Sequence, residues 1–440
     1  MRQIVAYARK VYGLPSLLGA ITDTRRAPWT SARLVATSVF HAGLLRIRSF
    51  NALEPRLGEG SFRRLAGAGA DERLGTADTL SRSLWVMDLE SVRRLSVEML
   101  RKAERNKVFR EGWYGALRYF AIDGWEPFCS RHRHCDECLV RHVRVKDASG
   151  VETAVEEYYH RFAVALLVDP RFDLLLDFEP LLPKDLRPVT PKGRKGNTQR
   201  VTKPDLDEGE LSTARRLLKR VKETFPWLDV VVGDALYANG PFLDAASRLG
   251  LGAVVVAKKQ SDEPLKEALA IWGDAAPQTT IENEEAHERI ELWDCPDLET
   301  LHTYRSGKIR CVRARLTKLD QPNRQPSTWS MLVTGAPQRR LSADRVLAIA
   351  RARWHIENTG FHQWVTRWRF GHVFTHNANA IRALFWLFFA AFNLLTLFLY
   401  CQLRSYGRDR GKNVTRTISR LVDEMLDDLA RLQAPISDTS

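Results

Sequence analysis

The chain has 440 residues, of which 44% are hydrophobic and 27% charged, and its 67 lysines and arginines against 53 acids give a formal net charge of +14. This composition excludes a disordered tail, a collagen-like chain and a small disulfide-stapled peptide, and it suffices for roughly two to four folded domains. The positive charge favours a polyanionic partner, either nucleic acid or an acidic membrane surface. Charge alone does not choose between these two.

Cysteine usage indicates a reducing compartment. Six cysteines in this length are too few for a disulfide-stapled secreted scaffold, and three of them lie close together in the sequence. The N-terminal segment lacks an apolar stretch followed by a small-residue cleavage site, so we expect no secretory signal. These two features predict a cytoplasmic protein.

Residues 1–105 are predicted to be helical throughout. Apolar residues recur at helical spacing in SARLVATSVFHAGLLRI and LESVRRLSVEMLRKAER, with arginine and lysine between them. The pattern predicts a basic helical domain. Its basic side chains have two interpretations of equal weight, a DNA-contacting face and an ordinary solvated face.

Residues 106–260 have a mixed texture. WYGALRYFAIDG, YYHRFAVALLVD and FDLLLDFEPLL predict three consecutive strands in an antiparallel meander. The segment 184–203 carries Lys192, Arg194 and Lys195 among prolines and glycines, which predicts an exposed basic loop. Beyond it a helix, a strand, a helix and a strand alternate, which predicts parallel pairing in an α/β sheet.

The last part of the chain contains one long apolar helix. Residues 261–340 are rich in strand-forming residues and predict an insertion with its own β structure, after which the helical period returns. Residues 383–401 contain no charged side chain and are long enough to cross a bilayer. Asn393 and Thr396 in their middle favour instead a helix buried in a large core.

Three acids have the positions that a metal site needs. Asp123 and Asp234 each end a predicted strand, and side chains just beyond the carboxyl ends of neighbouring strands share a crevice. Glu357 lies on a later helix that can add a third carboxylate, and such crowded anions need a divalent cation, for which Mg²⁺ is our prediction. Taken singly, each aspartate also fits a turn residue or a helix cap.

The motifs FAIDGWEPF, DVVVGDALYA and RARWHIENTGF, the last followed by the apolar helix, resemble bacterial insertion-sequence transposases of the DDE class over nearly the whole chain. The resemblance implies an RNase H-like α/β fold, with a mixed sheet flanked by helices, an N-terminal helical domain and a β-rich insertion before the last acid. It also implies that Asp123, Asp234 and Glu357 hold two Mg²⁺ ions and catalyse strand cleavage and transfer. The same comparison puts the apolar helix inside the core, so no membrane partner is expected.

The family signature around the last acid is half present. Relatives carry Tyr, Arg, Glu and Lys in a fixed register; here Arg353 and Glu357 fit, while Ala350 and Trp364 take the Tyr and Lys positions. How the DNA end is held, and whether cleavage passes through a hairpin, therefore stay open. Arg353 should share a helical face with Glu357, either as a phosphate clamp or as a simple i,i+4 ion pair.

Further residues are candidates for DNA contact. Lys258 and Lys259 end the strand that follows Asp234, where they either reach a phosphate backbone or remain solvated. Trp293 or Trp329 of the insertion can stack on a displaced base, and an ordinary core position is the alternative for each.

The segment CSRHRHCDECLVRHV, directly after the first acid, is dense in metal-ligating residues. Cys135 and Cys138 have the spacing of a zinc thiolate pair, and Cys129 with His142 can complete the site. The spacing is not that of a standard zinc finger, and reduced structural cysteines are the alternative. A zinc ion here would brace the turn beside Asp123 and would take no part in catalysis.

Together these observations predict a Mg²⁺-dependent DNA transposase. Its domains are 1–105 for DNA binding, 106–260 and 341–440 for the catalytic core, and 261–340 for the insertion. Its partners are the terminal inverted repeats of the element and target DNA, bound by a homodimer on the nucleoid. The alternatives are a catalytically silent transposase-derived DNA-binding protein, an RNase H-like nuclease without strand transfer, and a membrane-attached protein.

Overall fold

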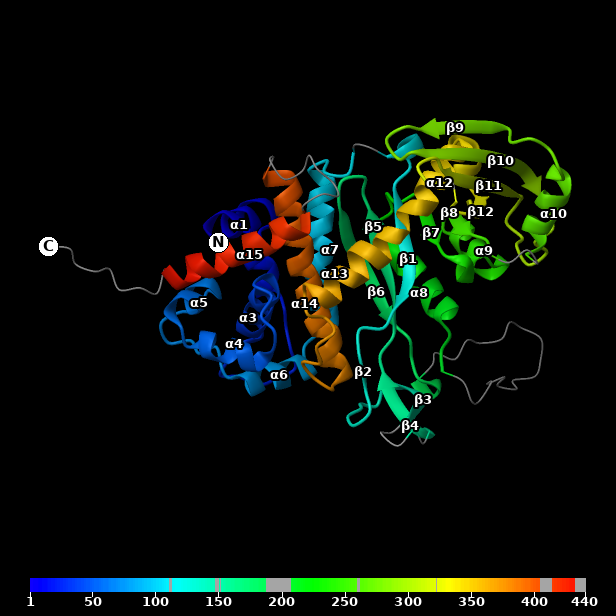
Figure 1. Cartoon of the computed structure of the whole chain (residues 1–440). Helices are drawn as coiled ribbons and strands as arrows, with labels where there is room; N and C mark the ends of the chain where they lie inside the picture. Colours follow the sequence, from blue (N-terminus) through cyan, green and yellow to red (C-terminus); the bar gives the residue numbers. More distant parts are fainter. Residues whose placement is uncertain are drawn as a thin grey trace.

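Nine strands form one mixed sheet in this computed structural model (Figure 1). The structure describes residues 1–110, 113–146, 150, 152–186, 207–258, 262–321, 323–403 and 414–431. The strand order is β6-β5-β1-β7-β8-β12-β11-β10-β9. The first five of these are β6 (Asp173–Pro180), β5 (Phe162–Val168), β1 (Tyr119–Trp125), β7 (Val230–Gly233) and β8 (Gly252–Val256).

These five strands have the arrangement expected of an RNase H-like core. Strand β5 runs antiparallel to both β1 and β6, whereas β1, β7 and β8 run parallel to one another. Strand β5 is buried along its whole length, as its continuous apolar run FAVALLV requires. The predicted meander and the predicted parallel pairing are both present, and the mixed α/β fold class is confirmed.

The β-rich insertion extends this sheet. The strands β9 (Thr279–Asn283), β10 (Glu288–Leu298), β11 (Ile309–Lys318) and β12 (Ser327–Thr334) are consecutive antiparallel neighbours. Strand β12 then pairs antiparallel with β8. The expectation of a separate β structure is therefore wrong, because the free edge of β8 supplies unpaired backbone groups that β12 satisfies.

A second, small sheet was not anticipated from the sequence. Its order is β2-β4-β3, with β2 (Cys129–Ser130), β3 (Leu139–Lys146) and β4 (Glu152–Tyr159) all inserted between β1 and β5. Strands β3 and β4 form an antiparallel hairpin that pairs Leu139 with Tyr159 at its base.

Helices make up most of residues 2–105, with non-helical connections between them. Ser31 and Asp88 begin two of them, since each side chain accepts a hydrogen bond from a backbone N–H of the first turn. The elements are α1 (Arg2–Tyr7), the π-helical turn η1 (Ala8–Tyr12), α2 (Leu14–Gly19), α3 (Ala32–Leu44), α4 (Phe50–Leu57), α5 (Gly60–Leu65), α6 (Ala77–Trp85) and α7 (Leu89–Arg105).

Further helices flank the sheet. They are α8 (Glu210–Thr224), α9 (Gly240–Arg248), α10 (Glu263–Trp272), α11 (Pro337–Arg340), α12 (Ala343–Ala352), the π-helical turn η5 (Ile356–Phe361) and α13 (His362–Thr366). Three short 3₁₀ turns in the described residues connect elements: η2 (Tyr114–Ala116), η3 (Lys184–Leu186) and η4 (Ala235–Tyr237). The C-terminal part adds α14 (Ala378–Leu397), η6 (Phe398–Gln402) and α15 (Val414–Arg431).

The apolar helix α14 lies between the N-terminal helices and the sheet (Figure 1). It packs against α3, α6 and α7 on one side and against β6 on the other. Its length and hydropathy are those of a membrane span, but 89% of its most apolar window is buried inside the protein. The buried-helix interpretation is confirmed, and no membrane protein is indicated.

Two of the helices predicted to be basic and amphipathic are largely internal. All residues of α3 from Leu34 to Leu44 are buried, and α7 is buried on most of its circumference. Arg93 of α7 points to the sheet, where it pairs with the fully buried Asp177 of β6 at 2.9 Å. The assignment of residues 1–105 to DNA binding stays a prediction.

Candidate active site

The parallel pair β1 and β7 brings two of the predicted acids to one edge of the sheet. Ala121 pairs with Val232, and the same register continued by two residues puts Asp123 beside Asp234. Asp234 follows β7 directly, and its Oδ1 accepts a hydrogen bond of 2.9 Å from the backbone N–H of Leu236. Asp234 is therefore a helix cap as well as a member of the acidic pair.

Arg353 joins the third acid to the first. Its Nη1 donates to Glu357 Oε1 at 2.7 Å and to Asp123 Oδ2 at 3.0 Å. The i,i+4 ion pair is therefore present, and it extends across to β1. Arg353 itself is only 5% exposed, so it does not project toward solvent as a phosphate clamp would. Glu357 lies in the π-helical turn η5, a rare conformation that is frequent at functional sites.

Burial raises the pKa of Asp123 to about 7. The guanidinium of Arg353 and the N–H of Gly124 act in the opposite direction, whereas the nearby charges of Asp234 and Glu210 raise this pKa further. The raised pKa means that the charged form of this carboxyl group is unfavourable without a nearby cation. The carboxylate gains from any cation that approaches it.

Glu210 is a fourth carboxylate at this edge, and sequence reasoning missed it. It begins α8, and its Oε2 accepts from Arg161 Nη2 at 2.7 Å while its Oε1 accepts from the Tyr237 hydroxyl at 2.7 Å. Its side chain is 8% exposed. In the sequence, a glutamate at the start of a helix indicates only a favourable interaction with the helix dipole, so this position had no distinguishing signal.

The oxygens of the three predicted acids do not form a closed set in this arrangement. Across the described ranges, the one group of three ligand atoms lying within 4.8 Å of one another is elsewhere in the molecule. The residue types nevertheless fit Mg²⁺, because Asp123, Asp234 and Glu357 offer the hard oxygen ligands that this ion requires. A cation, the Arg353 guanidinium, already bridges two of them, and its buried Nε has no hydrogen-bond partner among the described residues.

A pocket of about 320 Å³ opens beside Asp234. Lys258 and Arg313 contribute positive charge to its lining, and Trp329 and Trp354 contribute aromatic rings whose centroids lie 6.4 Å apart. Lys258 is exposed, and Trp354 is 43% exposed. Aromatic rings next to cations are the combination that receives a nucleotide base and its phosphate. The other basic candidates, Lys192, Arg194, Lys195 and Lys259, lie outside the described residues.

Other family-signature positions lie inside the protein. Ala350 and Trp364 are both fully buried, and Trp364 packs in an aromatic cluster with its ring 4.7 Å from that of Phe389. Trp293 stands under the guanidinium of Arg313 at 5.7 Å and is partly buried. Neither signature position is exposed for contact with a DNA end.

The cysteine-rich segment forms a cluster that differs from the predicted set. Cys135 and Cys138 lie together as expected, and their partner is His160. Cys129 is exposed in β2, and His142 lies on the exposed side of β3, 3.4 Å from Glu156. Cys129 and His142, which we predicted as ligands, therefore lie outside the cluster, and His160 is its third member.

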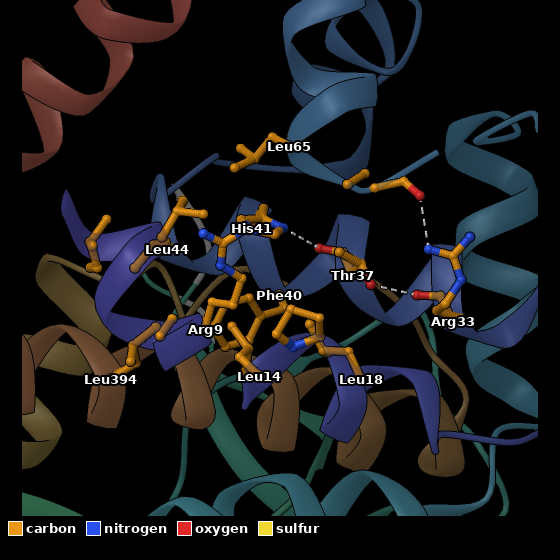
Figure 2. A pocket seen from close by; sticks show the side chains of 16 residues that line it. Arg9, Leu14, Leu18, Arg33, Thr37, Phe40, His41, Leu44, Leu65 and Leu394 are labelled. Atoms are coloured by element: carbon orange, nitrogen blue, oxygen red, sulfur yellow. Dashed lines mark hydrogen bonds between the residues drawn. The ribbon is translucent and has the colours of Figure 1, made fainter. Parts of the chain in front are cut away.

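An apolar pocket of about 140 Å³ lies far from this chemistry, among the N-terminal helices (Figure 2). Its lining comes from residues 4–67 together with Leu394 and includes none of the predicted acids. His41 borders it, and its Nδ1 donates to the carbonyl of Thr37 at 2.8 Å. The lining is mostly aliphatic and contains no carboxylate, so we assign this pocket no part in the chemistry of the acids.

Comparison with protein families supplies the identification. Residues 201–394 match the family model described as "Transposase DDE domain". This part of the chain is similar to the DDE domain of transposases. The predicted resemblance to insertion-sequence DDE transposases is confirmed, and DNA binding, recombination and transposition are typical of this family. No curated protein matches the chain.

The matched part of the DDE domain includes Asp234 and Glu357. Asp123 precedes it in the sequence, on β1, which is the immediate neighbour of β7 in the sheet. The family uses divalent metal ions in general and acts on DNA. A nuclease or transposase activity is what the DDE transposase family implies.

Proposed function

We propose that the protein is a Mg²⁺-dependent transposase that cleaves the ends of a DNA element and transfers them to target DNA. The observation that carries this proposal is the convergence of three acids from distant parts of the chain. Asp123 and Glu357 share the Nη1 of Arg353, and Asp234 follows the strand beside Asp123. If each acid were only a helix cap, a partner in an ion pair or a surface residue, the three would have no reason to lie close together.

Asp123, Asp234 and Glu357 would hold the metal. When bound, Mg²⁺ supplies the positive charge that activates an attacking hydroxyl and stabilises the leaving oxygen in phosphoryl transfer. The protein's own contribution is positioning. The hydrogen bond to Leu236 fixes Asp234, and Arg353 keeps Asp123 and Glu357 close to each other before a metal is bound.

The pocket beside Asp234 supports DNA as the substrate. Lys258 and Arg313 can contact phosphates, and Trp329 can stack on a base that leaves the duplex. The terminal inverted repeats would supply that DNA, and pairing two ends would require a homodimer. A cytoplasmic, nucleoid-associated location follows from this substrate.

The test is to incubate the full chain with a supercoiled plasmid that carries the flanking genomic DNA, in Mg²⁺, and to map the broken ends. Asp234→Asn should lower cleavage at least about a hundredfold while DNA binding in a gel-shift assay is retained, because the oxygen that would hold the metal is neutralised. The matched control is Asp274→Asn, an exposed aspartate that does not line the pocket beside Asp234, which should leave cleavage unchanged.

The outcomes separate the alternatives. Unchanged cleavage in Asp234→Asn would overturn the assignment of the acids. Specific DNA binding with no cleavage by the unsubstituted protein would indicate a silent transposase-derived binding protein. Broken ends that never join to target DNA would indicate a nuclease without strand transfer.

A further inference from the structure

We propose that Cys135, Cys138 and His160 bind a zinc ion that fastens the small sheet to the catalytic sheet. The Sγ atoms of the two cysteines lie 3.7 Å apart. The His160 Nε2 atom is 3.3 Å from Cys135 Sγ and 3.4 Å from Cys138 Sγ. Three ligand atoms of the types that zinc prefers thus form a nearly equilateral triangle.

The triangle has the size that zinc requires. With Zn–S of about 2.3 Å and Zn–N of about 2.0 Å, tetrahedral coordination separates two sulfurs by about 3.8 Å and a sulfur from a nitrogen by about 3.5 Å. The three observed separations agree with these values to within a few tenths of an ångström. Two thiolates with an imidazole favour zinc over Mg²⁺ or Ca²⁺, which take oxygen ligands.

The hairpin β3–β4 explains how residues 22 positions apart become neighbours. Cys138 immediately precedes β3 and His160 immediately follows β4, and the pair Leu139–Tyr159 closes the base of the hairpin between them. Cys135 joins Cys138 through a tight turn, in which the N–H of Cys138 donates to the Cys135 carbonyl at 3.1 Å. The backbone alone therefore preforms the site.

The surroundings indicate a structural role. His160 connects β4 with β5 of the large sheet, and its ring lies 6.4 Å from that of Phe162 with the planes nearly parallel. Glu137, between the two cysteines, accepts a hydrogen bond of 2.8 Å from Arg382 of α14. A metal at this point would tie the small sheet, the large sheet and the start of α14 together.

Three protein ligands leave one position of a tetrahedral zinc site to be filled. A pocket lined by His132, His134 and His376 opens next to the cysteine turn, since His134 directly precedes Cys135. Water or one of these imidazoles can complete the tetrahedron. This inference does not depend on the proposed transposase activity.

Metal analysis of the purified full chain, prepared without added chelator, tests the proposal. About one zinc ion per chain is expected. The double variant Cys135→Ser, Cys138→Ser and the single variant His160→Ala should each lose nearly all of it. The matched controls Cys129→Ser and His142→Gln, which alter the exposed cysteine and histidine of the same small sheet, should keep it.

A second measurement uses the unsubstituted protein, so that a variant which fails to fold cannot obscure the result. Titration with a mercurial thiol reagent in the presence of a colorimetric zinc indicator should release one zinc ion per chain, and the same zinc should be released in Cys129→Ser. Protein that is zinc-free both as purified and after incubation with zinc would overturn the proposal. Retention of zinc in the folded His160→Ala or double-cysteine variant would overturn it as well.

Discussion

Arg353 lies between two of the carboxylates of the candidate site and balances their negative charge. One nitrogen of this side chain serves Asp123 and Glu357 together, and the whole side chain is nearly inaccessible. Two crowded carboxylates need a cation, and a guanidinium meets that need when no metal is bound. If the acids bind a metal as in the proposed function, the arginine and the divalent cation compete for the same oxygens.

This competition predicts the behaviour of Arg353→Gln. Without magnesium the variant should lose about 2 kcal/mol of stability, because two carboxylates are left close together without a cation. Magnesium should restore more of the melting temperature in the variant than it adds to the unsubstituted protein. Thermal melts in EDTA and in Mg²⁺ measure both effects.

Arg351→Gln is the control for that experiment. Arg351 lies two residues earlier, in the last turn of α12, and pairs with Glu288 at 3.0 Å, but it is 45% exposed and has no contact with the acids in the described structure. Its melting temperature should respond to magnesium as the unsubstituted protein does. An equal response of all three proteins would mean that Arg353 and the metal do not share ligands.

His41 predicts a loss of stability in acid. Burial lowers its pKa to about 4, against a small opposite effect of its bond to Thr37, and Arg9 and Arg33 line the same pocket (Figure 2). In the unfolded chain the group titrates near 6.5, so the unfolded state binds more protons between about pH 6.5 and pH 4. The contribution is complete above pH 6.5 and is lost as the pH falls toward 4.

From pH 7.5 to pH 5.0 the unsubstituted protein should therefore lose about 2 kcal/mol more stability than His41→Gln, measured by urea unfolding. His142→Gln removes an exposed histidine and should follow the unsubstituted protein. If all three lose the same stability over this range, His41 is not the group that responds.

Some site residues were predictable and others were not, for a physical reason. Asp123 lies near the carboxyl end of the apolar strand β1 and Asp234 directly follows the apolar strand β7, and the carboxyl ends of neighbouring parallel strands meet at one edge of a sheet. Arg353 and Glu357 are four residues apart on one helical face, so their contact is local. Glu210 approaches Asp123 only because α8 begins beside β1, which no local pattern records.

At the scale of elements, the sequence predicted where strands form more reliably than it predicted which strands pair with each other. The apolar runs of β5, β7 and β8 predicted buried strands correctly. The hairpin β3–β4 alternates exposed and half-buried residues and resembles a polar loop, so it was missed, and with it the partnership of Cys138 and His160. The insertion was recognised as β-rich, but its union with β8 depends on a free sheet edge that only the fold creates.

At the scale of the whole molecule, one continuous core runs from the N-terminal helices to the sheet. Its buried residues extend from Ile4 to Leu429, and α14 contributes almost every side chain to it. A polar residue in the middle of α14 fixes the position of this helix against β6. Asn393 is fully buried, and its side chain accepts a hydrogen bond from the backbone N–H of Leu175 at 2.9 Å and donates one to the carbonyl of Leu175 at 2.8 Å. Both backbone groups of this residue of the edge strand β6 thus have hydrogen-bond partners.

Replacement of this asparagine tests whether the molecule unfolds as one unit. Asn393→Leu keeps the volume but leaves two buried backbone groups of Leu175 without partners, so stability should fall by about 3 kcal/mol. Because α14 contacts both α7 and β6, far-ultraviolet circular dichroism and tryptophan fluorescence should report a single shared urea transition, shifted to lower urea. Thr396→Val, a nearly isosteric change on the same helix, should shift it much less. Separate transitions for the two probes in the unsubstituted protein would show that the helices and the sheet are independent, and an unchanged midpoint in Asn393→Leu would show that this contact does not hold them together.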